Sequence, residues 1–553
     1  MRGRYLPVVI FLSVFVAPVP GRAQVIAPGD SVARQIAGHA RDSVVVVLND
    51  GDFAELSVFN PGGLSVAVSR PDGSRLRSFD EDIEFVAEGT GRYSVSIVND
   101  SAAPSKYALA FRRRLSLGER TGVGAIRDTI VSPRMQTLRR QLTSSNGNTA
   151  TFWQTVSQEG SPLVEPFDAN YDLVTFVWRA VNDVRNVFLR TTFSVPNEPN
   201  GRTYEFQRLD STDIWFLTLK IPKGARFLYR LEPNRPWEPS EFPPVTAQRD
   251  PYNKRTRCSG DGSKYSCSSI GELPDAPAQP LFVRTPGLPA GKVERKTIRS
   301  ALQKVERQLT IYTPANYAAE KGTLPLVVLF DGDDFLDTDD WHGLEIWDNL
   351  IAQKKIPPTV VVMVHNLSGR RLFDLVANAT FGDFMAKELI PWVRTNYKVS
   401  RSAARTVVGG ASAGGLAAAY MGIAHPEVFG NVLSMSGAFW WSPAHNGGIC
   451  AGLCATPNER PAVINRDATT ELNWVAQLAL DHPSPNVRYY LGAGTFEFDD
   501  DGTGGAILEE TRHLRDILRA QHHQVIYEQF PSGHDGQSWP AMMASGLQLL
   551  LRR

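Results

Sequence analysis

The stretch Thr406-Val-Val-Gly-Gly-Ala-Ser-Ala-Gly-Gly-Leu416 decides how this chain is interpreted. Within it, Gly410-Ala-Ser-Ala-Gly414 has the G-x-S-x-G pattern of a nucleophile elbow. The apolar run ending at Val407-Val408 predicts a buried strand, and the small residues that follow predict a helix ending at His425-Pro426. A serine on so sharp a turn needs small neighbours. The stretch therefore predicts Ser412 as a nucleophile, the alternative being a chance turn rich in glycine, alanine and serine.

Strands and helices alternate around this stretch, from about residue 281 to residue 553. Apolar runs predict strands, and amphipathic stretches predict helices between them. Short, fully apolar strands between amphipathic helices are typical of a doubly wound, mostly parallel sheet covered on both faces. With the elbow, the pattern predicts an α/β-hydrolase catalytic domain over 281–553. The main expected strands are 309–312, 326–330, 360–364, 487–491 and 525–530, and the expected helices are 347–351 and 381–397.

Two further triad members are expected after Ser412, because the chain order in this fold is serine, acid, histidine. Glu497 follows the late strand 487–491, and Asp499, Asp500 and Asp501 compete with it. His534 lies in a glycine-flanked loop after the last strand, where it can take the serine proton and return it to the leaving alcohol. The expected triad is Ser412, Glu497 and His534.

An oxyanion hole needs two backbone N–H groups near the serine. Ala413 follows the nucleophile and supplies one of them. The second is expected from Asp333, in the loop Asp331-Gly-Asp333 after the strand that ends at Phe330. The alternative is that this loop is only a tight turn.

The residues before the catalytic domain predict two β-sandwiches. Apolar alternation with glycine-rich turns predicts an accessory β-sandwich over 25–113, similar to the pre-peptidase C-terminal type of domain. A linker with a short helix near Met135 to Leu142 is expected over 114–148. A second, immunoglobulin-like sandwich is expected over 152–279.

The first 23 residues predict export. Arg2 and Arg4 precede an apolar run from Leu6 to Val16, and small residues stand where a signal peptidase would cut, so residues 1–23 are expected to be a signal peptide. The apolar run is too short to span a membrane, and no later segment is expected to span one. A periplasmic or secreted protein follows. Its formal net charge of +0 gives no reason to expect a nucleic-acid partner.

The cysteines form two local pairs, Cys258 with Cys267 and Cys450 with Cys454. In an exported protein, pairs so close in sequence predict disulfides. Zinc is the alternative, but no histidine stands at ligand spacing, so neither a metal nor another cofactor is expected.

Two sets of motifs resemble the enterochelin (enterobactin) esterase family, α/β-hydrolases of the esterase D-like type. Those before the catalytic domain are Phe152-Trp-Gln154, Gly160-Ser-Pro-Leu-Val164, Val174-Thr-Phe-Val-Trp-Arg179, Thr212-Asp-Ile-Trp215 and Asp250-Pro-Tyr-Asn253. Those within it include Asp331-Gly332, Arg371-Leu-Phe-Asp-Leu375, Glu388-Leu-Ile-Pro-Trp392, the elbow, Ser434-Met-Ser-Gly-Ala-Phe-Trp-Trp441 and Gly533-His-Asp535.

The resemblance implies a serine esterase that hydrolyses the trilactone of a catecholate siderophore and so aids iron release. A secreted carboxylesterase acting on feruloyl or acetyl esters of plant polysaccharide is the alternative, and a non-catalytic siderophore-binding protein is a third hypothesis. The chain departs from the family at Ala411, where the family often has glutamine, and at Asp374, where it has glutamate. Both departures bear on the substrate more than on the reaction.

An aromatic, anionic substrate requires flat apolar faces and a cation. Trp440, Trp441 and Arg371 are expected at the carboxyl edge of the sheet, where such folds bind ligands. Alternatively, one tryptophan belongs to the core and Arg371 forms an ion pair with Asp374 or Glu388. The oligomeric state is left open.

Overall fold

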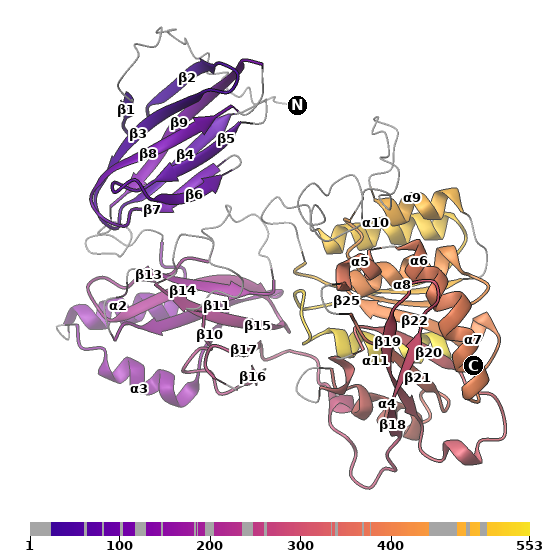
Figure 1. Cartoon of the computed structure of the whole chain (residues 1–553). Coiled ribbons are helices and arrows are strands. Elements are labelled where there is room, and N and C mark those ends of the chain that lie inside the picture. The colour runs from indigo at the N-terminus through magenta and orange to yellow at the C-terminus, as the bar shows by residue number, and fades with distance from the viewer. Residues whose placement is uncertain are drawn as a thin grey trace, which may run out of the picture.

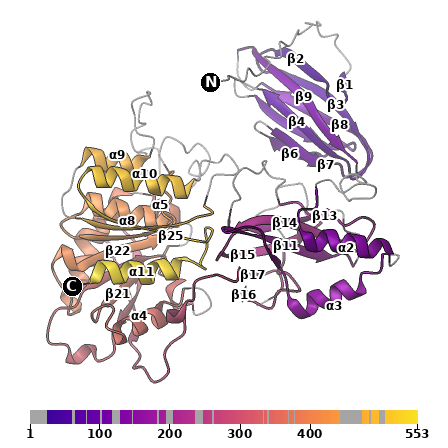
Figure 2. The ribbon, with the colours of Figure 1, turned by 180° about the vertical axis from the view of Figure 1, so that it is seen from behind.

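The chain folds into three lobes that follow one another in sequence (Figures 1 and 2). The computed structural model describes residues 24–552 apart from 60–63, 80–81, 100–102, 117–128, 145–146, 182–183, 185, 194–203, 235–246, 259–262, 333, 338–340, 368–369, 377, 442–472, 483–486 and 498–505. The expected signal peptide, residues 1–23, thus lies outside the described residues. Among those described, none of the helices has the length and apolar character needed to cross a membrane.

The first lobe is a sandwich of two sheets. Alternate side chains of its strands, such as Val44, Val46, Tyr93 and Val95, are fully buried in one core, as period-two alternation predicts. The described strands form sheets in the orders β1-β3-β8-β5-β6 and β2-β9-β4-β7. Their bounds are β1 Gln24–Ile26, β2 Ser31–Ile36, β3 Arg41–Leu48, β4 Phe53–Phe59, β5 Ser65–Ser69, β6 Arg75–Phe79, β7 Asp82–Val86, β8 Gly91–Val98 and β9 Ser105–Leu115.

The second lobe pairs two more sheets, in the orders β10-β11-β14-β13 and β12-β15-β17-β16 among the described strands. Their facing sides bury aromatic residues, among them Phe176, Trp215 and Phe227. The bounds are β10 Leu163–Pro166, β11 Tyr171–Arg179, β12 Val187–Thr191, β13 Gln207–Arg208, β14 Ile214–Pro222, β15 Arg226–Pro233, β16 Thr256–Cys258 and β17 Cys267–Glu272.

Two helices cover the outer face of the first of these sheets (Figure 1). Helix α2 (Pro133–Ser144) lies in the segment predicted as a linker, and it buries Met135, Leu138 and Leu142 in the same cluster as Val177 and Phe216 of the sheet. That part of the segment is therefore packed structure. Helix α3 (Ala150–Glu159) was not predicted, although Phe152, Trp153 and Val156 have the spacing of a buried helix face.

Residues from four of the N-terminal motifs meet on this lobe. The carboxylate of Asp213 accepts hydrogen bonds from Trp153 Nε1 (3.0 Å) and from Arg179 Nε (2.9 Å). The ring of Tyr252 stacks on Trp153 with centroids 5.2 Å apart. These motifs thus fix α3 against the sheet, which is a structural role.

The third lobe is built on one sheet of eight described strands, in the order β18-β19-β21-β20-β22-β23-β24-β25. Strands β18 and β19 run antiparallel to their neighbours. The other six strands, in the order β21, β20, β22, β23, β24 and β25, run parallel to one another. The bounds are β18 Lys292–Arg299, β19 Glu306–Thr313, β20 Leu326–Phe330, β21 Val360–Val364, β22 Thr406–Ala411, β23 Asn431–Met435, β24 Arg488–Gly494 and β25 Gln524–Phe530.

Helices cover both faces of this sheet (Figures 1 and 2). Two of them share one apolar cluster with one side of the sheet: α4 Gly343–Ala352 and α11 Trp539–Leu551. The other side packs against α5 Arg371–Leu375, α6 Ala379–Asp383, the π-helical turn η4 Phe384–Leu389, α7 Ile390–Asn396, α8 Ala413–Ala424, α9 Trp474–Asp481 and α10 Ile507–Ala520. Short 3-10 turns are η1 Pro280–Phe282, η2 Tyr317–Ala319, η3 Asp334–Leu336 and η5 Ala403–Arg405. Parallel β20, β22, β24 and β25 therefore end at one edge of the sheet, where the candidate site lies.

Candidate active site

Ser412 stands on a sharp turn between β22 and α8. Its backbone has φ 57° and ψ −121°, a strained conformation for a residue with a side chain. Its N–H donates to the carbonyl oxygen of Met435 on the neighbouring strand at 3.0 Å, which holds the turn. A Cβ at position 410 would lie 2.8 Å from the backbone of Gly414, so Gly410 is required for this close approach. Strand, turn and helix thus follow the order that the elbow predicts.

The imidazole of His534 connects Ser412 to a carboxylate. His534 Nε2 lies 3.0 Å from Ser412 Oγ, and His534 Nδ1 donates to Glu497 Oε1 at 2.7 Å. The histidine side chain is one-third exposed, whereas the Glu497 side chain is 1% exposed. Substrate can therefore reach the serine and the histidine, while the carboxylate is shielded from water.

Glu497 is held in place by the turn that follows β24. Its Oε2 accepts a hydrogen bond from Gly494 N at 2.6 Å, and its backbone carbonyl accepts from Leu508 N at 3.1 Å. Both carboxylate oxygens thus have hydrogen-bond donors, which fix the orientation of the side chain. The competing residues Asp499, Asp500 and Asp501 lie outside the described residues.

Trp539 at the start of α11 packs against the histidine. Its ring meets the His534 ring edge-on with centroids 5.1 Å apart, and its Nε1 donates to Ser436 Oγ at 3.1 Å. Ser436 follows β23 and also has a positive φ, 47°. The sequence does not predict a role for Trp539 beside the histidine, because nothing in its local pattern separates it from an ordinary core residue.

Of the two residues expected to form the oxyanion hole, Ala413 lies within the described part of the chain. Ala413 is the first residue of α8, so its N–H has no acceptor within the helix. Asp333 lies outside the described residues. Its loop does lie against the start of α8, because a Cβ at Gly414 would be 3.2 Å from Asp331 Oδ2.

Arg371 is ion-paired with Asp331 in that same loop. Its Nε and Nη2 donate to the two carboxylate oxygens at 2.6 and 2.8 Å, and Asn366 donates to Oδ1 at 2.7 Å. Burial lowers the pKa of Arg371, but the hydrogen bonds and charge of Asp331 outweigh it and raise that pKa above its usual value. About 40% of the arginine side chain stays exposed beside the site.

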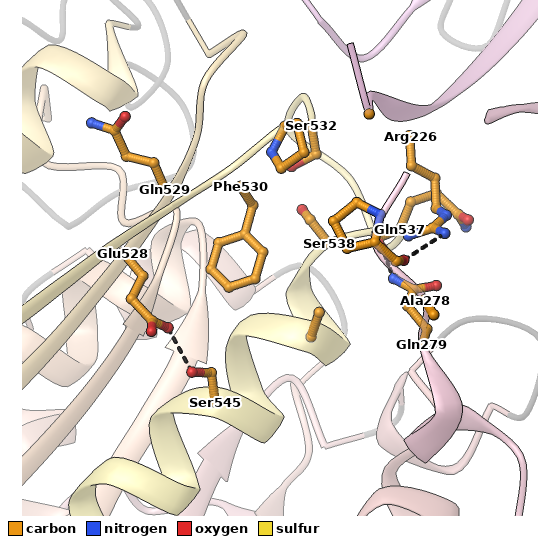
Figure 3. A pocket seen from close by; sticks show the side chains of 14 residues that line it. Arg226, Ala278, Gln279, Glu528, Gln529, Phe530, Ser532, Gln537, Ser538 and Ser545 are labelled. Carbon is orange, nitrogen blue, oxygen red and sulfur yellow. Dashed lines mark hydrogen bonds between the residues drawn. The ribbon is translucent and has the colours of Figure 1, made fainter. Parts of the chain in front are cut away.

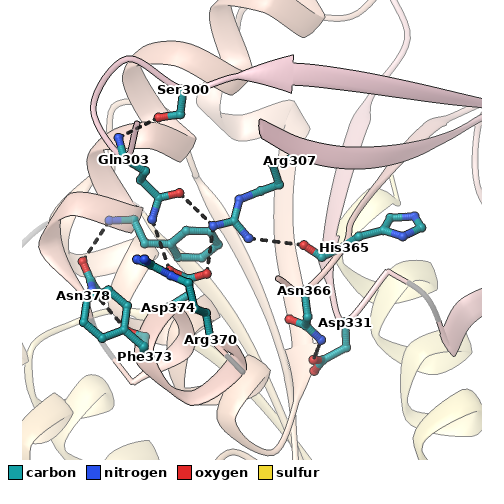
Figure 4. Close-up of polar contacts among 11 residues, drawn as sticks. Ser300, Gln303, Arg307, Asp331, His365, Asn366, Arg370, Phe373, Asp374 and Asn378 are labelled. Carbon is teal, nitrogen blue, oxygen red and sulfur yellow. Dashed lines mark hydrogen bonds and ion pairs between the residues drawn. The ribbon is translucent and has the colours of Figure 1, made fainter. Parts of the chain in front are cut away.

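The ion pairs suggested for Arg371 with Asp374 or Glu388 are wrong. Asp374 instead accepts from Arg307 Nη2 at 2.8 Å, and this pair is buried, with side chains 1% and 2% exposed (Figure 4). Gln303 donates to the other oxygen of Asp374 at 3.1 Å. The departure from the family at Asp374 therefore falls on a buried structural ion pair.

Glu388 also has a structural role. Its carboxylate accepts from Ser300 Oγ at 2.6 Å and from the backbone N–H groups of Ala301 and Leu302 at 3.0 and 3.1 Å. It thus fixes the turn between β18 and β19, away from Arg371.

The two tryptophans after β23 differ. Trp441 is 6% exposed, belongs to the core and meets Trp474 edge-on at 5.4 Å. Trp440 is only partly buried. The alternative that one tryptophan belongs to the core thus describes Trp441, and Trp440 is the one with exposed surface.

One of the two predicted disulfides is present. Cys258 and Cys267 are bonded and close the loop between β16 and β17. Cys450 and Cys454 lie outside the described residues.

A cavity of about 480 Å³ opens between the second and third lobes (Figure 3). Arg226 lines it from the second lobe and Phe530 from the end of β25. Ser532, Gln537 and Ser538 line it from the loop that also carries His534. None of the three residues of the hydrogen-bonded chain from Ser412 to Glu497 is among its lining. The cavity thus lies behind the histidine loop, at the seam between the lobes.

Comparisons with known proteins agree with this architecture. Residues 173–282 match the family model described as the enterochelin esterase N-terminal domain, and residues 300–550 match the Esterase family model. The iron(III) enterobactin esterase of Escherichia coli O6:H1 strain CFT073 is 27% identical over 435 residues, covering 73% of this chain and 97% of that protein. The iron(III) salmochelin esterase of that strain is 27% identical over 430 residues, covering 75% and 96%.

Solved structures give the same result. The crystal structure of the enterobactin esterase from Shigella flexneri in the presence of enterobactin matches with a TM-score of 0.54 and 25% identity, covering 72% of this chain and 97% of that one. The ferric enterobactin esterase from Salmonella typhimurium matches with a TM-score of 0.55 and 24% identity, covering 72% and 98%. The two family models occur in order along one chain, over the second and third lobes. The chain therefore belongs to the enterochelin esterase family.

Proposed function

We propose that this protein is a serine esterase that hydrolyses the ester bonds of a catecholate siderophore trilactone, such as iron-loaded or iron-free enterobactin. The observation that carries the proposal is the continuous chain from Ser412 Oγ through His534 to Glu497, at 3.0 and 2.7 Å. The relatives named as iron(III) enterobactin and salmochelin esterases support the substrate class. The eight-stranded sheet with its elbow supports assigning the third lobe to the α/β-hydrolase fold.

The reaction follows from the positions of these groups. Ser412 Oγ attacks the ester carbonyl carbon while His534 Nε2 takes the hydroxyl proton, which activates a weak nucleophile. The imidazolium then gives this proton to the alkoxide oxygen that leaves, and a serine-bound acyl group remains. Water, deprotonated by the same imidazole, releases the acid and restores Ser412. Glu497 stabilises the imidazolium and fixes the tautomer that leaves Nε2 free to accept.

The negative oxygen of the tetrahedral intermediate needs donors. The N–H of Ala413 is our first candidate, since it begins α8 directly after the nucleophile. The N–H of Asp333 stays a prediction for the second.

Trp440 and Arg371 are the proposed substrate contacts. Trp440 offers a partly exposed aromatic face, and Arg371 keeps part of its guanidinium exposed beside Asp331. An aromatic face and a cation match the catechol rings and negative charge of the substrate class.

Export to the periplasm or the medium is likewise proposed. It is supported by the basic and apolar segments of residues 1–23 and by the Cys258–Cys267 disulfide, a bond that persists in oxidising compartments. Sequencing the N-terminus of the protein recovered from the periplasm tests it: a start near Gln24 is expected, and a retained Met1 contradicts it.

The substrate class is tested by comparing kcat/KM for enterobactin with that for a feruloyl ester. We expect the trilactone to be preferred by about 100-fold or more, because binding energy from its three catechol arms is available only to that substrate. A preference for the feruloyl ester would instead support the polysaccharide esterase. The Ser412→Ala variant, assayed beside the wild type, shows how much of each rate belongs to the site.

A further inference from the structure

The loop that carries His534 is joined to the second lobe by hydrogen bonds between backbone groups. The N–H of His534 donates to Thr192 O at 2.6 Å, and the N–H of Arg226 donates to Pro531 O at 3.0 Å. A Cβ at Gly533 would lie 2.1 Å from Thr192 O, so only glycine allows this approach. Thr192 follows β12 directly, at a strand end of the second lobe. The position of the histidine is therefore fixed partly from outside the catalytic lobe.

The side chain of Asp535, next to His534, makes a second set of contacts across the seam. Its Oδ2 accepts hydrogen bonds from Thr192 Oγ1 and from Leu228 N, the latter at 3.1 Å. Its Oδ1 accepts from Gln537 N at 2.8 Å. Asp535 is 4% exposed, and burial raises the pKa of its carboxyl group. A buried carboxylate depends on its donors, so the Thr192 hydroxyl matters to the conformation of this loop.

The acid of the triad is anchored at the same place. Phe496, next to Glu497, is 2% exposed and belongs to the apolar core of the second lobe rather than to that of the third. Its ring meets Phe193 at 6.1 Å, and Phe193 meets Phe227 of β15 at 4.7 Å, both edge-on. Asp535, next to His534, is thus held by Thr192. Phe496, next to Glu497, is held by Phe193, the residue that follows Thr192 at the same strand end.

We propose that the strand end Thr192-Phe193 positions the acid and the base of the triad, with Thr192 and Asp535 as positioning residues for His534 and Phe193 with Phe496 as positioning residues for Glu497. This inference rests on the proposed serine-esterase function and assigns the second lobe a part in catalysis. The four residues act through the two loops rather than on the substrate itself. A displacement of about 1 Å at a catalytic group costs on the order of 100-fold in rate. Even a modest loosening of the loop should therefore lower kcat measurably.

Three variants of buried or half-buried threonines test the proposal. Thr192→Val removes the hydroxyl at nearly constant shape, and Thr192→Ser restores it. Thr175→Val is the matched control, because Thr175 is buried in the same lobe and its hydroxyl is hydrogen-bonded within that lobe, to Thr218 Oγ1 at 2.9 Å. Any general effect of losing a threonine hydroxyl from this lobe should appear in the control.

The expected result is a change in kcat with little change in KM. Thr192→Val should lower kcat about tenfold or more, Thr192→Ser should recover most of it, and Thr175→Val should stay within about twofold of the wild type. Equal kcat values for Thr192→Val and Thr175→Val, or no difference between valine and serine at position 192, would overturn the proposal. Thermal unfolding of each variant ensures that folded protein is compared.

Amide hydrogen exchange gives a readout that does not depend on turnover. Exchange in the peptide covering residues 531–538 should be faster in Thr192→Val than in Thr175→Val, and unchanged exchange there would overturn the anchoring. If the wild type hydrolyses no ester, the proposed function fails, and the exchange result still decides whether the strand end holds the loop.

Discussion

The Nδ1 atom of His534 lies 2.7 Å from Oε1 of Glu497, a residue 37 positions earlier in the turn that follows β24. The other oxygen of Glu497 accepts from the backbone of Gly494 at 2.6 Å. Each carboxylate oxygen therefore faces a donor. This arrangement fixes which nitrogen of His534 carries the proton, and the first prediction follows from it.

Glu497→Gln should lower kcat by on the order of 1,000-fold with the fold intact. One oxygen becomes an NH₂ group, which must face either His534 Nδ1 or Gly494 N, and either choice disturbs the imidazole. Initial rates of ester hydrolysis measure the effect, with Glu528→Gln as the control, because Glu528 bonds Tyr490 and Ser545 instead of the histidine. If Glu497→Gln kept activity within tenfold of wild type and a variant of Asp499, Asp500 or Asp501 lost most of it, that aspartate would be the triad acid instead.

Much of this site could be predicted because its signals are local. The elbow is encoded by Gly410, Ser412 and Gly414, and the structure shows why a side chain at 410 has no room. His534 and Glu497 follow strands with strong apolar patterns, so their positions at the sheet edge follow from topology. The chain order of the fold supplied the rest.

The contacts that could not be predicted join distant segments. Arg371 pairs with Asp331 and Arg307 with Asp374, across 40 and 67 residues, and no local pattern separates these partners from other nearby charges. Thr192 meets Asp535 across 343 residues and between lobes. Such pairings depend on how elements pack, which periodicity does not encode.

Trp440→Ala should raise KM for a catecholate trilactone by about tenfold, because stacking of an aromatic ring on its exposed face is worth roughly 1–1.5 kcal/mol. Hydrolysis of p-nitrophenyl acetate, which lacks the catechol arms, should change little. Trp440→Phe keeps an aromatic face and serves as the matched variant. Unchanged KM in both variants would remove Trp440 from the substrate site.

Arg307→Met should lower the free energy of unfolding by about 3–5 kcal/mol, because it leaves Asp374 charged and buried without its main partner. Methionine keeps most of the apolar stem but removes the guanidinium, whose central carbon lies 5.0 and 5.5 Å from the ring centroids of Phe381 and Phe384. Arg139→Met is the control, since the Arg139–Asp210 pair is exposed and worth at most about 1 kcal/mol. Urea unfolding followed by tryptophan fluorescence compares them, and equal losses would contradict the assignment.

His523 should make stability depend on pH. Burial lowers the pKa of its imidazole below the ordinary 6.5, and its ring packs edge-on against Tyr489 at 5.2 Å. The folded protein therefore binds the proton less readily than the unfolded chain. The stability contributed by the neutral ring is fully present above pH 6.5 and is lost as the pH falls through the lowered pKa.

His523→Gln should flatten this part of the dependence of the melting temperature on pH. His522→Asn, at an exposed position where φ is 64° and asparagine is tolerated, should leave it as in the wild type. A profile that falls equally steeply in both variants would assign the effect to other groups.

The most direct test of the account is mass spectrometry of the products after enterobactin is incubated with the mature protein or with Ser412→Ala. We expect the wild type to yield linear trimer, dimer and monomer of the dihydroxybenzoyl-serine unit, while the variant, with its fold unchanged, leaves the trilactone intact. An intact trilactone with the wild type, or equal product formation by Ser412→Ala, would contradict it.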